Sequence, residues 1–600
     1  MKRVALGLWF VVSVVGCSSH RAPDDAARGA GGASSGAGAG GTASLVMMGG
    51  GSGGLGGSGL SLLVPDASGP VNICSPDLRS VTTDEGVLVQ ACHDDEQCAN
   101  GQCLSACDAA ATNETSVGCD FYAAQLNRSG CFAAFIANTW ATPVTLTAEY
   151  AGTALDMTKM ARIPSGSGTS ITYTPLAGNV LPAGEVAILF LDDGFCSTVT
   201  GVELPQTRTG SDRVLASGID HAVHITTDRP VSAYTINPYG GGDSAVTSST
   251  MLLPTSTWDT NYVAVDVFAE FQDRGLTTQI VAMADATEVT ILPTGQILAG
   301  GTVAASPAGV SQTYQLNRGE MLELSNHEGL SGSPIQATKP VGVWGTTQAL
   351  GIPKDTLDVD SGHVEIPPVR ALGSEYVAVR YRNRVAGAPE ETPPWRLLGV
   401  VDGTTLEYEP ARPPGAPTTL SAGQLVTFQA EGQFVVRSQG KSYPFYMAQH
   451  MTGCRILDPD MPVGCPGGPE TINVISSAQY LDRYVFFSDP TYPETDVVVV
   501  RERAPDGTFK AVNLDCAGDL SGWTSVGKNF EYTRVDLVRD DFVKQGACDN
   551  GRHEIKSDGP FSLTVWGWGT AEIQRAVSYG YTGGAGIREV TEVRVPPVVK

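Results

Sequence analysis

Thirteen cysteines are the residues of this chain with the clearest capacity for chemistry, and five of them lie between Cys74 and Cys107. The spacing Cys98-x4-Cys103-x3-Cys107 could supply thiolate ligands to zinc, but zinc sites of this kind belong mostly to reducing compartments. Setting Cys17 aside leaves an even number of cysteines, which in an exported protein predicts disulfides. The disulfide candidates are Cys74, Cys92, Cys98, Cys103, Cys107, Cys119, Cys131, Cys196, Cys454, Cys465, Cys516 and Cys548.

Spacing does not determine how these cysteines pair. For the later part of the chain, the pairs that we expect are Cys131 with Cys196, Cys454 with Cys465, and Cys516 with Cys548. The cysteines from Cys74 to Cys119 would then form a knot of their own.

Other residues that could do chemistry do not combine into a site. His221 and His224 are three apart, so on one strand they would face opposite sides, and joint metal binding would need a bend. The HExxH zinc motif and the GxSxG nucleophile elbow are both absent. Asp192-Asp193-Gly194 lacks the alternating acids of an EF-hand loop and predicts a polar turn. We therefore predict no catalytic residue, no metal site and no cofactor, and leave open weak calcium binding between acidic loops.

Trp566 and Trp568 lie on one face of a predicted strand, and two interpretations apply to them. An exposed pair could stack on a sugar ring or anchor a protein partner, which makes these tryptophans candidates for ligand contact. A buried pair would fill a core or a seam between domains. Trp344 recurs at a comparable place, and this repetition favours the structural interpretation.

The N-terminus predicts export and a lipid anchor. Lys2 and Arg3 precede an apolar run from Val4 to Val15, which is too short to span a bilayer as a helix. The run ends at Val14-Val15-Gly16-Cys17, which resembles a bacterial lipobox, whose cysteine is acylated and becomes the first mature residue. Ser18 follows rather than Asp, which in that class usually implies sorting to the outer membrane. The interpretation set aside is an ordinary cleaved signal with an incidental cysteine.

Composition argues against some partners. The chain has 38 Lys plus Arg against 63 Asp plus Glu, for a formal net charge of -25. Nucleic acids and anionic lipid surfaces would repel so acidic a protein. We expect contact with a membrane through the N-terminal lipid only, and no nucleic-acid partner.

The elements that must position these residues are strands. Val, Thr, Ile and Tyr alternate in short runs bounded by Gly, Pro and Asp, as in Val289-Thr-Ile-Leu and Val497-Val-Val-Val-Arg501, and no sustained helical stripe occurs. We predict an all-β fold of tandem or intertwined β-sandwich repeats, preceded by a small disulfide-rich module and a disordered tether rich in Gly, Ser and Ala. The predicted divisions are a lipoprotein signal with lipobox (1–17), the tether (18–70), the Cys-rich module (71–119), a β-repeat region (120–590) and a C-terminal tail (591–600).

Sequence marks recur in a set order through the β region and predict its units. A Pro that opens a strand recurs at Pro230, Pro340 and Pro560, where the sheet ladder can spare the missing N–H. A Tyr-Val-Ala-Val type of strand then begins the next unit, at Tyr262, Tyr376 and, more loosely, Tyr484. We predict units at about 120–255, 256–370, 371–475 and 476–590. Units of this size suit sandwiches, because propeller blades are usually smaller.

Taken together, these marks resemble the N-terminal domain family of the IgGFc-binding protein over about residues 120–585. The segments that carry the resemblance are Gly118–Ala123, Ile225–Pro238, Leu252–Pro254, Tyr262–Val265, Val565–Trp568 and Ser578–Tyr581. The family occurs in a vertebrate mucus-associated protein and in bacterial surface proteins. The resemblance implies ligand binding outside the cell, with Fc binding as the founding activity, and it assigns no contact residue.

These observations support the hypothesis of a non-enzymatic adhesin or binding protein at the cell surface, with extracellular protein or glycan ligands bound through loops. The segments 386–394 and 351–362 are predicted surface loops free to contact a ligand. Two alternatives stay open, a passive envelope scaffold or spacer and a hydrolase with scattered catalytic residues.

Overall fold

Strands dominate the fold, which confirms the all-β prediction. The computed structural model describes residues 71–126, 130–191, 196, 216–241, 246–268, 275–354, 358–457, 466–570 and 576–596. Cys17, the tether, Asp192, Asp193 and Cys465 therefore lie outside the described residues. The described part from residue 71 onward belongs to one compact unit rather than to separate sandwiches.

The Cys-rich module is small and cross-linked. Its elements are β1 (Asn72–Cys74), β2 (Ser80–Thr83), β3 (Leu88–Ala91), β4 (Glu96–Ala99), β5 (Gln102–Ser105) and α1 (Ala106–Asn113). Its disulfides are Cys74–Cys98, Cys92–Cys103 and Cys107–Cys119. The last of these joins α1 to the first strand of the β region, so a covalent bond fastens the module to that region. Elsewhere Cys131 bonds to Cys196 and Cys516 to Cys548, and Cys454 is also disulfide-bonded.

Four β assemblies follow one another along the chain. The first is a 10-stranded sheet of β6 (Val117–Ala123), β7 (Ala133–Asn138), β8 (Val144–Tyr150), β9 (Thr153–Ala154), β10 (Ala161–Ser165), β11 (Thr172–Pro175), β12 (Val180–Leu181), β13 (Val186–Phe190), β15 (Val223–Ile236) and β16 (Ser249–Met251). The second is an 8-stranded sheet of β14 (Gly218–His221), β17 (Asp259–Val263), β18 (Leu276–Ala282), β19 (Thr287–Ile291), β20 (Gln312–Leu316), β21 (Glu320–Asn326), β22 (Pro334–Gly351) and β23 (Val359–Glu365). Because β14 precedes β15 in the chain but joins the second sheet, the first two assemblies are intertwined.

The third assembly consists of three small sheets and the fourth of one large sheet. The third holds β24 (Glu375–Ala378), β30 (Phe434–Arg437) and β27 (Glu407–Glu409), then β29 (Leu425–Gln429), β25 (Pro394–Gly399), β31 (Phe445–Met451) and β32 (Glu470–Asn473), and the pair β26 (Thr404–Thr405) and β28 (Thr419–Leu420). The fourth is a 9-stranded sheet of β33 (Leu481–Ser488), β34 (Glu494–Glu502), β35 (Val512–Leu514), β36 (Gly518–Asp519), β37 (Thr524–Val526), β38 (Phe530–Arg539), β39 (Val543–Lys544), β40 (Gly551–Trp568) and β41 (Ser578–Thr582). The other helical segments are short: α2 (Met157–Met160), η1 (Gly168–Ser170), η3 (Thr255–Thr257), η4 (Val369–Ala371), η5 (Cys454–Ile456) and η6 (Ser477–Gln479). No helix among the described residues is both long and apolar enough to cross a bilayer.

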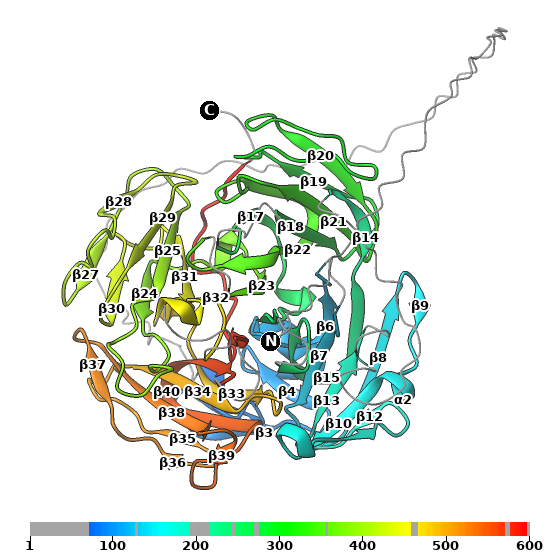
Figure 1. The fold of residues 1–600 in the computed structure, drawn as a ribbon. Coiled ribbons are helices and arrows are strands. Elements are labelled where there is room, and N and C mark those ends of the chain that lie inside the picture. The colour runs from blue at the N-terminus through cyan, green and yellow to red at the C-terminus, as the bar shows by residue number, and fades with distance from the viewer. Residues whose placement is uncertain are drawn as a thin grey trace, which may run out of the picture. The chain divides into compact units, whose positions relative to one another are not determined.

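One inner strand from each assembly contributes to a closed ring. β16 contacts β23, β23 contacts β32, β32 contacts β41, and β41 contacts β16, as Figure 1 shows for the four assemblies in succession. Side chains connect these strands to one another. Ser249 Oγ donates to Gly580 O at 2.9 Å, and Asn473 Nδ2 donates to Glu365 O at 2.7 Å. Repetition of sheets about a common set of inner strands is the arrangement found in β-propellers.

A tyrosine is used in the same way at the start of three assemblies. Each hydroxyl accepts a hydrogen bond from the backbone N–H three residues earlier and donates to a carbonyl on a long partner strand. In order of donor, tyrosine and acceptor, the first set is Asp259 N, Tyr262 and Val341 O. The second set is Gly373 N, Tyr376 and Phe445 O. The third set is Leu481 N, Tyr484 and Phe561 O. These are the tyrosines that recur in the sequence, so their recurrence reflects a buried hydrogen-bonded corner and not a surface motif.

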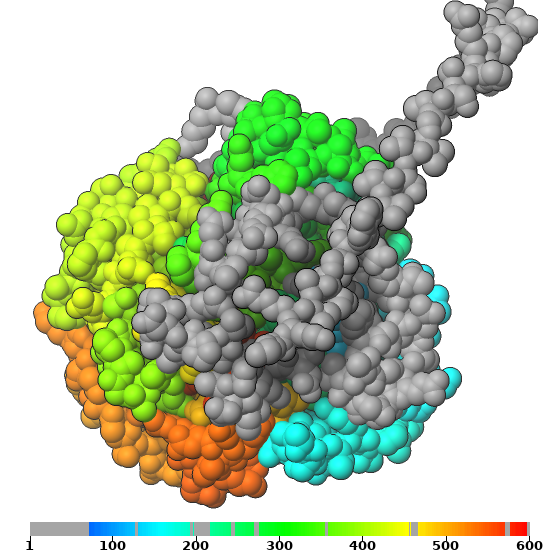
Figure 2. All heavy atoms as spheres, viewed as in Figure 1, coloured from blue at the N-terminus to red at the C-terminus, as the bar shows by residue number. Residues whose placement is uncertain are grey.

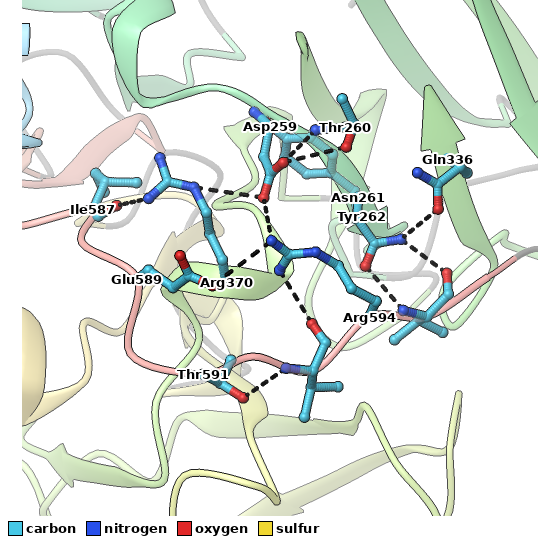
Figure 3. A network of polar contacts seen from close by, with 12 residues as sticks. Asp259, Thr260, Asn261, Tyr262, Gln336, Arg370, Ile587, Glu589, Thr591 and Arg594 are labelled. Carbon is cyan, nitrogen blue, oxygen red and sulfur yellow. Dashed lines mark hydrogen bonds and ion pairs between the residues drawn. The ribbon is translucent and has the colours of Figure 1, made fainter. Parts of the chain in front are cut away.

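The C-terminal segment joins the two ends of the described chain. Ser116 N donates to Ala585 O at 2.8 Å beside β6. Farther along, Asn261 and Val595 exchange two hydrogen bonds of 2.9 Å. Figure 3 shows Arg370 beside the same segment, where its Nη1 donates to Ile587 O at 2.8 Å. Residues 585–595, which we call the C-terminal strap, therefore tie the first assembly to the second and third.

Candidate binding groove

A groove between the second and third assemblies is lined by residues from both predicted loop segments. The prediction of a surface loop over all of 351–362 is wrong, because residues 359–362 belong to the buried strand β23. It has an apolar compartment of about 560 Å³ and a polar compartment of about 480 Å³, and Phe268 and Thr427 line both. Figure 2 shows the green surface of the second assembly beside the yellow-green surface of the third. The predicted loop 351–362 supplies Ile352 and Pro353 to the apolar compartment, and the loop 386–394 supplies Thr392 and Pro394.

The apolar compartment is rich in proline and aromatic side chains. The lining includes Phe268, Ile352, Pro353, Pro394, Pro414, Phe428 and Ile456. Ile456 is 46% exposed, so its side chain is accessible at this surface. Such a surface suits an apolar side chain of a ligand, because binding would remove apolar area from water on both partners.

A buried ion pair holds the loop 386–394 in place. Arg384 Nη2 lies 2.9 Å from Glu391 Oε2, and the two side chains are almost completely buried. Tyr381 donates to the same carboxylate at 3.1 Å, and Arg384 Nη1 donates to Thr452 O at 2.8 Å. Burial opposes ionisation of Glu391, but the charge and hydrogen bonds of Arg384 outweigh it and hold the pKa of this carboxyl below its ordinary value. The tip of the loop, including Gly387 and Glu390, remains exposed.

The polar compartment contains a buried carboxylate with one oxygen engaged. Asp266 is 3% exposed, and its Oδ2 accepts from Ser331 N at 2.6 Å and Ser331 Oγ at 2.8 Å. Its Oδ1 has no hydrogen-bond partner among the described residues. Desolvation raises the pKa of Asp266 above its ordinary value. Gly329, with φ of +89°, permits this approach, because a Cβ there would lie 2.9 Å from Oδ2.

Arg396 of β25 lines the polar compartment. Its Nη1 donates to the backbone oxygens of Asp266 at 2.9 Å and Val267 at 2.8 Å, and its guanidinium lies 5.5 Å from the centre of the Phe268 ring. The guanidinium therefore fixes the turn that presents Asp266 and Phe268 to the groove.

The third feature of the groove is an unpaired strand edge. Leu425, Thr427 and Gln429 of β29 line the groove, and β29 pairs only with β25 among the described strands. The strand carries no charged residue and no proline, which are the common means of protecting an edge.

Other predicted site residues do not assemble into sites. His224 is nearly buried, with Nδ1 3.2 Å from Glu149 and Nε2 3.1 Å from Asp120. His221 lies on β14 in the neighbouring sheet, where its ring packs edge-on to Tyr150. The chain passes from one sheet to the next at Ala222, so the two imidazoles serve different assemblies.

One trio of potential metal ligands occurs among the described residues. Asp515, Cys516 and His553 place ligand atoms within 4.8 Å of one another. Cys516 is disulfide-bonded to Cys548, so it offers no thiolate. His553 Nδ1 lies 2.9 Å from Asp515 Oδ1. The trio fits a hydrogen-bonded corner better than a metal centre.

The interpretation of Trp566 and Trp568 as ligand-contact residues is wrong. Both side chains have 0% exposure and pack around Tyr381, with ring centroids 5.0 and 6.2 Å away. Phe561, on the opposite face of β40, is also fully buried. Because β40 lies inside its sheet and is covered on both faces, neither indole can reach a ligand.

A larger cleft of about 800 Å³ lies between the Cys-rich module and the first and fourth assemblies. Its charged groups are engaged within the protein. Asp77 accepts from Ser75 at 2.6 Å, Arg79 lies 4.1 Å over Trp140, and Glu114 pairs with Arg370 at 3.0 Å. The groove differs from this cleft in its apolar lining and in a strand edge that no other described strand pairs with.

The sequence interpretation missed Asp266, Phe268 and the Arg384–Glu391 pair. The alternation in Leu425-Val-Thr-Phe-Gln429 predicts a strand, but nothing in the sequence shows that the strand lies at an edge. Asp266 and Phe268 carry no motif, because their role depends on residues that are distant in the chain.

Comparison with known proteins identifies one match. A family model described as IgGFc binding protein matches residues 248–567, a range that includes both walls of the groove. The matched range begins at residue 248, next to the inner strand β16 of the first assembly, whereas the resemblance seen in the sequence begins at about residue 120. No curated protein and no solved structure matches the chain.

Proposed function

We propose that the chain, which belongs to the IgGFc-binding protein family, is an adhesin or binding protein for extracellular protein or glycoconjugate ligands, because that family is one of binding domains. The observation that carries this proposal is the groove, where two predicted surface loops, an apolar compartment and an unpaired strand edge meet. Recognition through loops on a rigid β scaffold is a common use of such folds.

We also propose that the protein is a lipoprotein at the cell surface, anchored in the outer membrane through Cys17. The support is the basic start, the short apolar run and the lipobox-like ending of the first 17 residues. Two lipid-bearing signals are usually needed for stable anchoring, and a lipoprotein cysteine carries several acyl chains.

Replacing Cys17 by Ala is expected to release the protein from the membrane, because the acylated side chain is removed. Fractionation of cells into membrane and soluble fractions, followed by immunoblotting, measures this. Ser18→Ala is the matched control and should leave the protein with the membrane. A Cys17→Ala protein that stays in the membrane fraction would contradict the lipid anchor.

A retention experiment tests ligand binding. The Cys17→Ala protein, immobilised in oxidised form, is exposed separately to IgG Fc, mucin and extracellular matrix, with the reduced protein as control. Retention of one ligand by the oxidised form alone supports the adhesin and names its ligand class, because loss of the disulfides destabilises a cross-linked fold. Failure to retain any of the three would favour the envelope scaffold.

A further inference from the structure

We propose that the groove binds an extended segment of a protein ligand, which adds to the edge of β29 as an extra strand. The inference rests on the proposed function, since it names the kind of ligand segment that the groove takes. Strand addition gives affinity through main-chain hydrogen bonds and specificity through pockets for alternate side chains. The groove provides both requirements.

The register of β25 shows which backbone groups of β29 are turned outward. Gly399 N donates to Gln424 O at 2.9 Å, so this pair is hydrogen-bonded between the strands. The bonds of an antiparallel pair alternate, so Val426 and Phe428 also face β25. Leu425, Thr427 and Gln429 are left with their N–H and C=O groups directed away from β25.

The other side of the same sheet gives the same register independently. Val474 N donates to Met447 O at 3.0 Å, which turns Met447 toward β32. Its neighbour Ala448, opposite Arg396, then faces β25. Arg396 therefore bonds toward β31, and Thr427, opposite Arg396 on β29, bonds outward. The residues with outward backbone groups are the ones that line the groove.

The two compartments lie in order along this edge. Leu425 and Thr427 line the polar compartment, and Thr427, Phe428 and Gln429 line the apolar one. Side chains two residues apart on a strand are about 6.8 Å apart and point to the same side. An added strand can therefore place one side chain in each compartment while its backbone pairs with β29.

The chemistry of the compartments defines the segment. The apolar compartment takes an aliphatic or aromatic side chain against Phe268, Pro414 and Ile456. In the polar compartment, Asp266 Oδ1 is a buried acceptor without a partner among the described residues, so it calls for a side chain with an N–H or O–H donor. The compartment is lined by two acidic side chains, Asp266 and Glu328, and by two basic ones, Lys354 and Arg396, so a neutral donor such as a hydroxyl or an amide fits it best. The ligand segment is thus extended, with an apolar and a donor-bearing residue at alternate positions.

Thr427→Pro tests the inference, with Thr427→Ala as the matched control. Proline removes the outward N–H without removing a bond to β25, and edge strands tolerate proline at such positions. Alanine removes the same side chain but keeps the N–H. The probe is a phage-displayed library of twelve-residue peptides, selected on the immobilised full chain carrying Cys17→Ala. Selected peptides are then labelled, and their Kd values are measured by fluorescence anisotropy.

The expected result is a Kd at least tenfold weaker for Thr427→Pro than for Thr427→Ala, since a strand pairs through several bonds and proline also obstructs its approach. Equal Kd values for the two variants, at equal melting temperatures, would overturn strand addition. Backbone N-methylation of the peptide gives a second test on the unaltered groove. Methylation of the odd-numbered or of the even-numbered peptide nitrogens removes the N–H groups on one side of an added strand. One of these two peptides should lose binding and the other should keep it. Equal effects of the two methylation patterns would overturn the inference.

The two proposals fail in different ways. Retention of folded Fc or mucin together with equal binding by Thr427→Pro and Thr427→Ala would leave the binding function standing and refute the strand mode. A library that yields no peptide on the oxidised chain would also refute the strand mode. Absence of retention for every folded ligand tests the binding function itself.

Discussion

Replacement of Arg384 by Ala is expected to lower the free energy of unfolding by about 3–5 kcal/mol, because it leaves the Glu391 carboxylate buried without its counter-charge. The side chains of Arg384 and Glu391 are 0% and 3% exposed, so water cannot take the place of the guanidinium. Arg384 also donates to Thr452, so the variant loses a second buried contact. Urea unfolding at neutral pH, followed by circular dichroism, measures the change.

Two further variants make this prediction specific. Lys159→Ala removes an ion pair whose side chains are 63% and 47% exposed, and it should leave the midpoint of unfolding unchanged. Replacing Arg384 by Met and Glu391 by Leu together should recover much of the lost stability, since no charge then stays buried. An Arg384→Ala protein as stable as Lys159→Ala would show that the pair does not hold this loop. We also expect weaker ligand binding, because the loop supplies Thr392 and Pro394 to the groove.

The second large effect concerns pH and Glu470 in the ring of inner strands. Glu470 is fully buried and accepts hydrogen bonds from Ser248 Oγ at 3.1 Å, Ser249 N at 3.3 Å and Thr471 N at 2.8 Å. Burial raises the pKa of this carboxyl well above its ordinary value, and these hydrogen bonds oppose the rise without cancelling it. No cationic partner is among the causes that shift it.

The direction of the pH effect follows from proton binding. Above the ordinary value of 4.5 the unfolded chain has lost the Glu470 proton while the folded chain still holds it. The stabilising contribution of this group is therefore complete below pH 4.5 and declines as the pH rises toward the folded pKa. The decline is about 1.4 kcal/mol per pH unit at its steepest.

Glu470→Gln is expected to remove this part of the pH dependence, because the amide does not ionise. Melting temperatures between pH 4.5 and 8 should fall less steeply in the variant than in the unaltered protein, with exposed Glu288→Gln as the control. Burial lowers the pKa of His363 to about 3, so that histidine acts in the opposite direction as the pH falls below 6.5. Because His363 is present in all three proteins, the difference between their profiles isolates Glu470. Parallel profiles for all three would contradict a protonated Glu470 in the folded state.

Local patterns predicted the β class well, and contacts between distant residues account for the features that those patterns missed. The run of β-branched residues Val497–Val500 identifies a strand, and the coverage of both its faces follows from tertiary packing. The recurring Tyr262, Tyr376 and Tyr484 are visible in the sequence, whereas their carbonyl partners lie on long strands from elsewhere in the chain. Trp566 shows what local patterns cannot predict, because the same strand pattern fits an exposed tryptophan that contacts a ligand and a tryptophan buried in the core.

The binding groove was only partly predictable for the same reason. The proline-rich composition of residues 386–394 predicts a loop, and the structure places the end of that loop on the groove. The facing wall comes from Asp266 and Phe268, more than a hundred residues earlier in the chain. No local pattern connects the two walls, because their meeting depends on how the second and third assemblies pack.

The C-terminal strap sets the order of events in making this protein. Ser116, at the start of the β region, bonds to Ala585, so this contact cannot form until the chain has been synthesised as far as the strap. Earlier assemblies can form their own hairpins during synthesis, but the contacts of the strap form only after residues 585–595 have been added. A premature stop that removes only the strap would thus leave an open molecule with buried polar groups such as Arg370 exposed to water. The strap therefore makes closure of the fold depend on residues that lie far along the chain from the strand beside which they bind.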